Sequence, residues 1–474
     1  MAKININSWV VFMNAKYNQI GILPVILLLI ISACSDYSTP EFDLIIANVS
    51  LIDGTGKEIQ SGVNVYVKDS TIARIDRNEI NQSRGVIDGS KKYLIPGLLD
   101  AHYHLQDVPG EAVEESPSLK QLIHFGITGV LIPGGSLASY KNLERLKQLE
   151  TAGEITAPHL FYTSLTAALE GGHPMKMYGE NKYTDSVNVH IVKDTNHIRS
   201  IVREASRQGA VGIKIMIEDG PMPPFTPRMP QDYINTFSTV GKEFGLPVFA
   251  HVSDMTEVRM GVKGDVDAFM HFMGVQIDWE KDQETVDQVV SDSISWVTTA
   301  MLAKSFFYPL NKDWLEHDAY NVFTEDQMQP LSDPDGRLEA ESRMILSGYM
   351  GSDTIPMEVM LEPMANDLKR LYDKGVAVVL GTDVGGRPYI LPGISVHEEM
   401  QLLELGGFTP EEIIKISSYN AAKMMGISDT YGSIEEGKVA DMVLLDENPM
   451  KSISNTLSIH TVIKNGIIQK RLSE

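Results

Sequence analysis

The stretch from Leu94 to Leu105 constrains the fold more than any other part of the chain. It reads LIPGLLDAHYHL, an apolar run that ends in two histidines separated by one residue. Because the side chains of a strand repeat with period two, we predict that His102 and His104 lie on one face at the end of a buried β-strand. Neutral imidazole is a common ligand of zinc and related ions. An isolated pair of this kind is also compatible with one packed and one solvated histidine, so further ligands must come from other strands.

Seven more apolar runs follow, and they alternate with amphipathic segments, a pattern typical of a parallel α/β fold. Eight strands over roughly 330 residues fit a (β/α)8 barrel, whose active site lies at the carboxyl ends of the strands. We therefore predict a (β/α)8 (TIM) barrel over residues 94–425. The seven runs are 127–132, 159–165, 211–217, 247–252, 267–272, 294–299 and 376–381.

Short strands separated by Gly and Asp flank the barrel segment on both sides. Asn465-Gly466 is a hairpin signal between two apolar pairs near the end of the chain. We predict one small β-sandwich domain built from residues 43–93 and 426–474. Its expected strands are 44–51, 63–67, 72–75, 439–445 and 461–468.

The longest interval without a predicted strand, residues 301–373, follows the seventh barrel strand. It contains many Met, Pro, Asp and Glu residues. Long irregular segments inside a compact domain are often functional. The interval is either a lid that contacts the substrate or a surface decoration.

The N-terminal segment has the features of a lipoprotein signal peptide. Basic residues precede an apolar run, residues 20–31, that is too short to span a bilayer. The run is followed by small residues and Cys34, which resembles the lipobox of bacterial lipoproteins and makes Cys34 the expected lipidation site. We expect residues 1–33 to be a signal peptide, residues 34–42 a tether, and the protein to be anchored on the periplasmic side of a membrane. A transmembrane anchor with a stray cysteine is the alternative.

Charge excludes one class of partner. The net charge of −23 argues against nucleic acid, because phosphate binding depends on clustered Lys and Arg, and the sequence has no such cluster. A small-molecule substrate is expected instead.

Four further candidate ligands stand where predicted strands finish. Lys214 lies in the fourth strand, His251 ends the fifth, His271 ends the sixth, and Asp383 follows the eighth. Each is weak evidence alone, since strand-end histidines are often packed or solvated and strand-end aspartates commonly cap helices. Their joint order along a barrel predicts a metal centre.

The order His-x-His, Lys, His, His, Asp, together with a split β-domain, resembles the amidohydrolase superfamily. Several short stretches are similar to its imidazolonepropionase and Xaa-Pro dipeptidase-like branch, and the resemblance covers nearly everything after the tether. These stretches are Gly171-Gly172-His173, Ile213-Lys214-Ile215-Met216, Gly381-Thr382-Asp383, Thr409-Pro410-Glu411-Glu412, Tyr419-Asn420-Ala421-Ala422 and residues 432–441, which read GSIEEGKVAD.

The resemblance implies two divalent metal ions that share a hydroxide. Zinc is expected, with manganese, cobalt or iron as alternatives. Lys214 would bridge the ions as a carbamate formed from carbon dioxide, which a buried lysine with a lowered pKa can form. The first ion is assigned to His102, His104 and Asp383, and the second to His251 and His271.

The resemblance also implies an enzyme that hydrolyses a carbon–nitrogen bond in an amide, a cyclic amide or a dipeptide. Asp383 would take the proton of the hydroxide and pass it to the departing amine. His173 would contact the carbonyl oxygen, and Arg387 and Tyr389 would hold a substrate carboxylate. Pro174 departs from the Gly that usually follows Gly-Gly-His in this branch. Barrels of this family often associate, so a homo-oligomer is one alternative and the oligomeric state stays open.

Two other readings stay open. One is a mononuclear deaminase of the same superfamily in which Lys214 is structural; the absence of an acidic residue beside Lys214 on its strand favours carboxylation instead. The other is a non-catalytic, lipid-anchored binding protein. The presence of every metal-ligand residue in the sequence argues against it. The deaminase would use His102, His104, His251 and Asp383.

Overall fold

The computed structural model describes residues 41–78, 83–105, 116–134, 140–179, 183–220, 225–351, 354 and 356–472. Nearly all of these belong to one compact unit, Phe42–Glu474. The predicted signal peptide and Cys34 lie outside the described residues. Among the helices that the structure describes, none has both the length and the apolar character needed to cross a bilayer.

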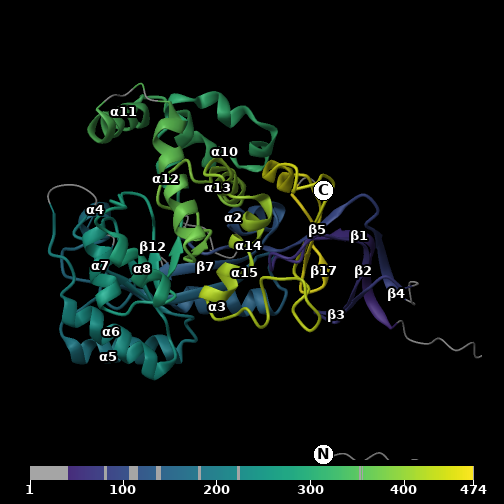
Figure 1. The fold of residues 1–474 in the computed structure, drawn as a ribbon, viewed down its shortest axis with the longest axis horizontal. Coiled ribbons are helices and arrows are strands. Elements are labelled where there is room, and N and C mark those ends of the chain that lie inside the picture. The colour runs from purple at the N-terminus through teal and green to yellow at the C-terminus, as the bar shows by residue number, and fades with distance from the viewer. Residues whose placement is uncertain are drawn as a thin grey trace, which may run out of the picture. The chain divides into compact units, whose positions relative to one another are not determined.

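Eight parallel strands close into the predicted barrel (Figure 1). Each pairs in parallel with the next, from the first to the eighth. The Ala101 N–H group donates to the Leu380 carbonyl at 3.0 Å, which joins the first strand to the end of the eighth. Seven of the predicted strands are thereby confirmed, and the first is confirmed in its second half. The eight barrel strands are β6 (Leu98–Asp100), β7 (Ile127–Gly134), β8 (His159–Ala168), β10 (Ile213–Met216), β11 (Val248–His251), β12 (Ala268–Met270), β13 (Ser295–Val297) and β14 (Ala377–Val379).

Amphipathic helices connect the strands. In α5 (Thr195–Arg207) the buried residues Ile198, Ile201 and Val202 share one face, and the Asp194 side chain caps the first turn. A short strand, β9 (Val189–Ile191), adds to the edge of β8. The other helices of the barrel are α2 (Pro117–His124), α3 (Tyr140–Thr151), α4 (Met175–Tyr178), α6 (Gln231–Phe244), α7 (Met255–Lys263), α8 (Gln283–Ser291), α12 (Met357–Asp373), α13 (Ile394–Leu405), α14 (Pro410–Ile416) and α15 (Tyr419–Met424).

A second sheet takes its strands from both ends of the chain, as predicted. β5 pairs in parallel with β1 and antiparallel with β15, which joins the two contributions. Asn465 and Gly466 have positive φ values of 52° and 72°, so the hairpin predicted there is confirmed. The sequence did not predict β4. The strands are β1 (Phe42–Leu51), β2 (Gln60–Lys68), β3 (Thr71–Asp76), β4 (Ser83–Asp88), β5 (Tyr93–Pro96), β15 (Met442–Leu445), β16 (Ile459–Lys464) and β17 (Ile467–Ile468).

The prediction of one strand over Leu94–Leu105 is wrong in one respect. The stretch is two strands, with β5 in the second sheet and β6 in the barrel. Gly97 separates them, and its N–H group donates to the Asp441 carbonyl at 2.9 Å. A Cβ atom at Gly97 would overlap the Thr128 side chain. Only glycine therefore fits at the position where the chain passes from the second sheet to the barrel.

The long interval after β13 is helical. Tyr308 and Tyr320 are buried, and the Tyr308 ring stacks on Tyr389 with 5.5 Å between ring centres. This packing attaches the interval to the loop that follows β14. Its elements are α9 (Met301–Lys304), α10 (Glu325–Met328), α11 (Arg337–Met350) and the 3-10 turns η3 (Tyr308–Leu310), η4 (Lys312–Glu316), η5 (Asp318–Val322) and η6 (Gln329–Ser332).

Candidate metal centre and active site

The ends of the first and eighth barrel strands bring three potential ligands together. His102 and His104 face the same side, as period two predicts, with their Nε2 atoms 3.2 Å apart. Oδ1 of Asp383 lies 3.5 Å from Nε2 of His102 and 3.0 Å from Nε2 of His104. The Asp383 N–H group donates to the His102 carbonyl at 2.8 Å, so barrel closure sets this spacing. The geometry of the three side chains is suitable for one metal ion.

His251 and His271 lie beside this group. The His271 ring centre is 4.4 Å from that of His102 and 4.2 Å from that of His251. Nδ1 of His271 is 3.0 Å from the Thr299 hydroxyl, which leaves Nε2 for another partner. The structure therefore gathers all four predicted histidine ligands with Asp383 at one rim of the barrel.

Two of these residues have an unusual backbone conformation, with φ of 78° at His271 and 59° at Asp383. Met270 packs within the barrel, so an extended backbone would turn the next side chain outward. The left-handed φ turns His271 inward instead. Such a conformation costs a non-glycine residue about 1–3 kcal/mol and persists where the surrounding structure imposes it.

Lys214 lies deeper than the rim, in register with Phe249, whereas the ligand-type His251 is in register with Met216. The lysine is 2% exposed, and its Nζ atom has no hydrogen-bond partner among the described residues. Burial lowers the pKa of Lys214 to about 7, although the negative charges of Asp383 and Glu218 act in the opposite direction. As expected, no acidic residue neighbours Lys214 along its strand, but Asp383 and Glu218 lie near it in space. A neutral amine is the form that can react with carbon dioxide.

Burial also lowers the pKa of His102, His251 and His271, that of His251 to about 4, and the surrounding histidines and Lys214 reinforce the effect. These imidazoles are neutral at pH 7, which is the form that binds a metal ion. Several nitrogen lone pairs and one carboxylate crowded into a buried site are a donor set that suits zinc, manganese, cobalt or iron. The residues present therefore fit the metal ions expected from the sequence.

A residue that sequence reasoning missed, Glu218, lies in the same site. It follows β10 and is 3% exposed. Its Oε1 atom is 2.9 Å from Nδ1 of His173, and its Oε2 atom is 3.2 Å from Nε2 of His251. Burial acts to raise the pKa of Glu218, but His251 and His173 outweigh it and hold that pKa well below its usual range. An acid just beyond the end of the strand that carries Lys214 was the signal that could have found it.

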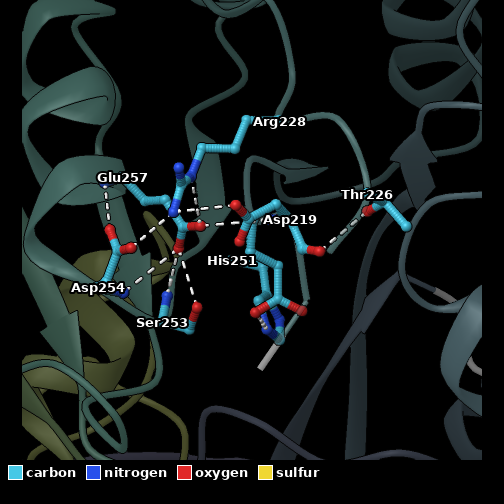
Figure 2. A network of polar contacts seen from close by, with 8 residues as sticks. Asp219, Thr226, Arg228, His251, Ser253, Asp254 and Glu257 are labelled. Atoms are coloured by element: carbon cyan, nitrogen blue, oxygen red, sulfur yellow. Dashed lines mark hydrogen bonds and ion pairs between the residues drawn. The ribbon is translucent and has the colours of Figure 1, made fainter. Parts of the chain in front are cut away.

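A polar network fixes the loops that carry Glu218 and His251 (Figure 2). Arg228 donates from Nε to Glu257 at 3.0 Å and from Nη2 to Asp254 at 2.7 Å, and it pairs with Asp219 at 3.1 Å. Glu257 also accepts from the Ser253 N–H group at 2.6 Å and from the Asp219 N–H group at 3.3 Å. Asp254 and Glu257 form a capping box at the start of α7. The loop after β10 is thereby tied to the loop after β11.

Asp100 ties the first strand to the eighth behind the ligands. It is fully buried and accepts hydrogen bonds from the His102 N–H group at 3.1 Å and from the Thr382 hydroxyl at 2.6 Å. Burial raises the pKa of Asp100 to about 7. Its contacts hold the backbone of His102 and of the residue that precedes Asp383.

The two predicted substrate-side residues on the loop after β14 differ in their surroundings. Arg387 donates from Nη1 to Glu341 at 2.7 Å and lies over the Phe306 ring, while its buried Nε and Nη2 atoms have no partner among the described residues. Tyr389 is 1% exposed and donates its hydroxyl hydrogen to the Leu331 carbonyl at 2.9 Å. Arg387 therefore has N–H donors that no described residue uses. The Tyr389 hydroxyl attaches the interval 301–373 to the loop after β14.

The comparisons with known proteins agree on one family. The amidohydrolase family model matches residues 93–468. An imidazolonepropionase of Pseudomonas savastanoi pv. phaseolicola (strain 1448A / Race 6) is 24% identical over 365 residues, which make up 76% of this chain and 80% of that protein. A 5-methylthioadenosine/S-adenosylhomocysteine deaminase of Caldanaerobacter subterraneus subsp. tengcongensis is 24% identical over 465 residues, or 90% of this chain and 94% of that protein.

A solved structure confirms the fold. A Xaa-Pro dipeptidase crystallised with methionine in its active site superposes with a TM-score of 0.67 and 22% identity, over 90% of this chain and 99% of that one. This similarity supports a (β/α)8 barrel with an added sheet domain.

Proposed function

Because the chain belongs to the amidohydrolase family, whose matched relatives are hydrolytic enzymes, we propose that it is a metal-dependent hydrolase that cleaves the carbon–nitrogen bond of an amide, a cyclic amide or a dipeptide. The observation that carries this proposal is the cluster of histidines, Asp383 and the buried amine of Lys214, which has no partner among the described residues, at the carboxyl end of the barrel.

The cluster divides into two binding positions. His102, His104 and Asp383 would hold one ion, and His251 and His271 a second, with carboxylated Lys214 reaching both. When bound, the ions supply Lewis acidity and a water that is acidic enough to attack a carbonyl near neutral pH.

The side chains around the reacting bond handle protons and charge. Asp383 accepts the proton of the attacking water and delivers it to the departing amine. The ring nitrogen of His173 that does not face Glu218 would donate a hydrogen bond to the carbonyl oxygen, and this requires hydrogen on both ring nitrogens because Nδ1 donates to Glu218. The Asp383 N–H group donates to the His102 carbonyl at 2.8 Å, so the barrel holds this carboxylate in place before reaction.

Arg387 points to the substrate class. A guanidinium with two buried nitrogen atoms, Nε and Nη2, that have no partner among the described residues is suited to a carboxylate, which it binds with paired hydrogen bonds. We infer a substrate with a free carboxylate, such as a dipeptide or an N-acyl amino acid. Tyr389 stays the less direct candidate for this contact, because its hydroxyl donor is engaged with Leu331.

A screen of dipeptides, N-acyl amino acids and lactones with zinc- or manganese-loaded protein tests the proposal. We expect release of an amine from at least one carboxylate-bearing amide, and Arg387→Lys should raise KM for that substrate more than for its uncharged methyl ester. Hydrolysis that is undiminished in Lys214→Ala would contradict the binuclear proposal.

A mononuclear deaminase is the second candidate, favoured by the similarity to the deaminase named above over 90% of this chain. It predicts release of ammonia from an aminated ring and one metal ion per chain. Two ions per chain and no ammonia would exclude it.

We also propose that Cys34 carries a lipid anchor on the periplasmic side of a bacterial membrane. The support is the apolar run and small residues that precede this cysteine. The full-length protein should partition with membranes, and Cys34→Ser should not. Equal partitioning of the two would contradict the anchor.

A further inference from the structure

Glu218 contacts both halves of the proposed site, and none of the roles above uses it. Its two carboxylate oxygens take different partners, Oε1 toward His173 at 2.9 Å and Oε2 toward His251 at 3.2 Å. The two histidine rings are 5.1 Å apart, centre to centre. One buried carboxylate therefore stands between a proposed substrate contact and a proposed metal ligand.

The ring atoms that face Glu218 are not the same in the two histidines. His173 presents Nδ1 and His251 presents Nε2. A carboxylate only accepts hydrogen bonds, so both of these nitrogens must carry hydrogen. Nε2 of His173 and Nδ1 of His251 are then the ring nitrogens that face away from Glu218. In neutral His251 this selects the tautomer whose Nδ1 has a lone pair for a metal ion, whereas Nε2 of His173 can donate to a substrate oxygen only if it carries a second hydrogen.

The position of Glu218 is itself fixed. The Asp219 N–H group that follows it donates to Glu257, and Glu257 also holds Ser253, two residues beyond His251 (Figure 2). Glu257 is fully buried and begins α7 with Asp254. Glu257 thus joins the loop after β10 to the loop after β11, and this connection holds Glu218 against His251.

We propose that Glu218 is a positioning residue that links the second metal position to the substrate side, by holding His251 with Nδ1 toward the ion and His173 with Nε2 toward the substrate oxygen. The proposal rests on the proposed function and adds to it a residue that controls both metal affinity and turnover. Carboxylates that accept the second N–H group of a metal-binding histidine commonly change metal affinity or activity by about 10–100-fold when removed.

The test compares Glu218→Gln with Glu243→Gln. Glutamine keeps the size of the side chain but presents one acceptor and one donor, so it cannot accept from both histidines. Glu243→Gln makes the same exchange on the exposed side of α6, where the side chain pairs with Arg199 and takes no part in the network that holds Glu218. Zinc binding to the metal-free full chain is measured by titration calorimetry without substrate, and kcat and KM are measured separately.

In Glu218→Gln we expect the second zinc ion to bind about 10–100-fold more weakly than in the wild type, while the first binds unchanged, and kcat to fall by a similar factor with little change in KM. Glu243→Gln should match the wild type in all three, and Glu218→Asp should recover part of the loss. Wild-type affinity for both ions and wild-type kcat in Glu218→Gln would overturn the proposal. So would an equal loss in Glu243→Gln.

These results separate this inference from the proposed function. If the wild-type chain binds two zinc ions and Glu218→Gln behaves like it, only the role of Glu218 is wrong. If the wild-type chain binds no zinc, the proposed function fails and this inference fails with it.

Discussion

The barrel buries ionisable side chains at both ends, but it treats them in opposite ways. At the amino end, His159 lies 3.0 Å from Glu150 and 3.0 Å from Asp441, and Glu150 also pairs with Lys464. Two acids thus meet two bases. At the carboxyl end, Asp383 and Glu218 contact histidines, but the histidines outnumber these two acids, several of their rings face one another, and Lys214 has no hydrogen-bond partner among the described residues.

The pKa directions express the same contrast. Burial alone would lower the pKa of His159, but Asp441 and Glu150 outweigh burial and raise it above its ordinary value. At the carboxyl end burial lowers the pKa of His102, His251 and His271, and no acid reverses this. At the amino end, a cluster with as many acids as bases joins the barrel to the second sheet. At the carboxyl end, the cluster has more nitrogen donor atoms than acids, and a metal ion can bind these atoms.

Replacing one acid at each end should break this comparison most visibly. Asp383→Asn removes the group that carries the proton, so we expect kcat for the substrate found by screening to fall by about 10²–10⁴-fold. Asp441→Asn should leave kcat close to the wild-type value. Steady-state kinetics of the two variants decide the matter, and a fully active Asp383→Asn would contradict the assignment.

Lys464→Met should show the reverse pattern. It leaves buried Glu150 without its lysine, and breaking a buried ion pair on one side costs about 3–5 kcal/mol of unfolding free energy. Denaturant unfolding should show this loss, with kcat/KM unchanged in the folded protein. Unaltered stability would mean that the amino-end cluster does not hold the two sheets together.

Metal removal should affect the carboxyl end alone. Zinc at 100 times its dissociation constant stabilises a protein by about 2.7 kcal/mol per site, so chelation should lower the unfolding free energy by that amount. Lys464→Met should lose the same increment as the wild type. If neither zinc nor chelator changes the unfolding free energy of the wild type, this result would count against a metal centre.

The two ends should also differ in their pH dependence, in chelator-treated protein. The pKa of His251 falls from 6.5 to about 4 on folding, chiefly through burial, so its contribution to stability is kept above pH 6.5 and lost as the pH falls toward 4. That of His159 is raised, so its contribution is kept below pH 6.5 and lost as the pH rises through the folded value. Each can change the slope by about 1.4 kcal/mol per pH unit at most.

Unfolding curves at a series of pH values measure these slopes. His251→Asn should flatten the acid side of the stability profile and His159→Asn the alkaline side. Identical profiles for the two variants would show that the ends do not differ in the way described.

Much of this arrangement could be predicted from local patterns, because strand periodicity places His102 and His104 on one face and barrel topology brings strand ends to one rim. The role of Glu218 could not, because Glu218 and its partner His173 lie in the loops after β10 and β8, and loop paths are not encoded in periodicity. The inward turn of His271 needed the left-handed φ that only the folded barrel imposes. The break at Gly97 depends on a close approach to Thr128 that no local pattern reveals.

Anomalous X-ray scattering from crystals grown with zinc tests the account most directly, because it locates the ions without reference to any substrate. We predict two peaks at the carboxyl end of the barrel, one among His102, His104 and Asp383 and one beside His251 and His271, and none near His159. The absence of peaks at the carboxyl end, or a peak at the amino end instead, would contradict it.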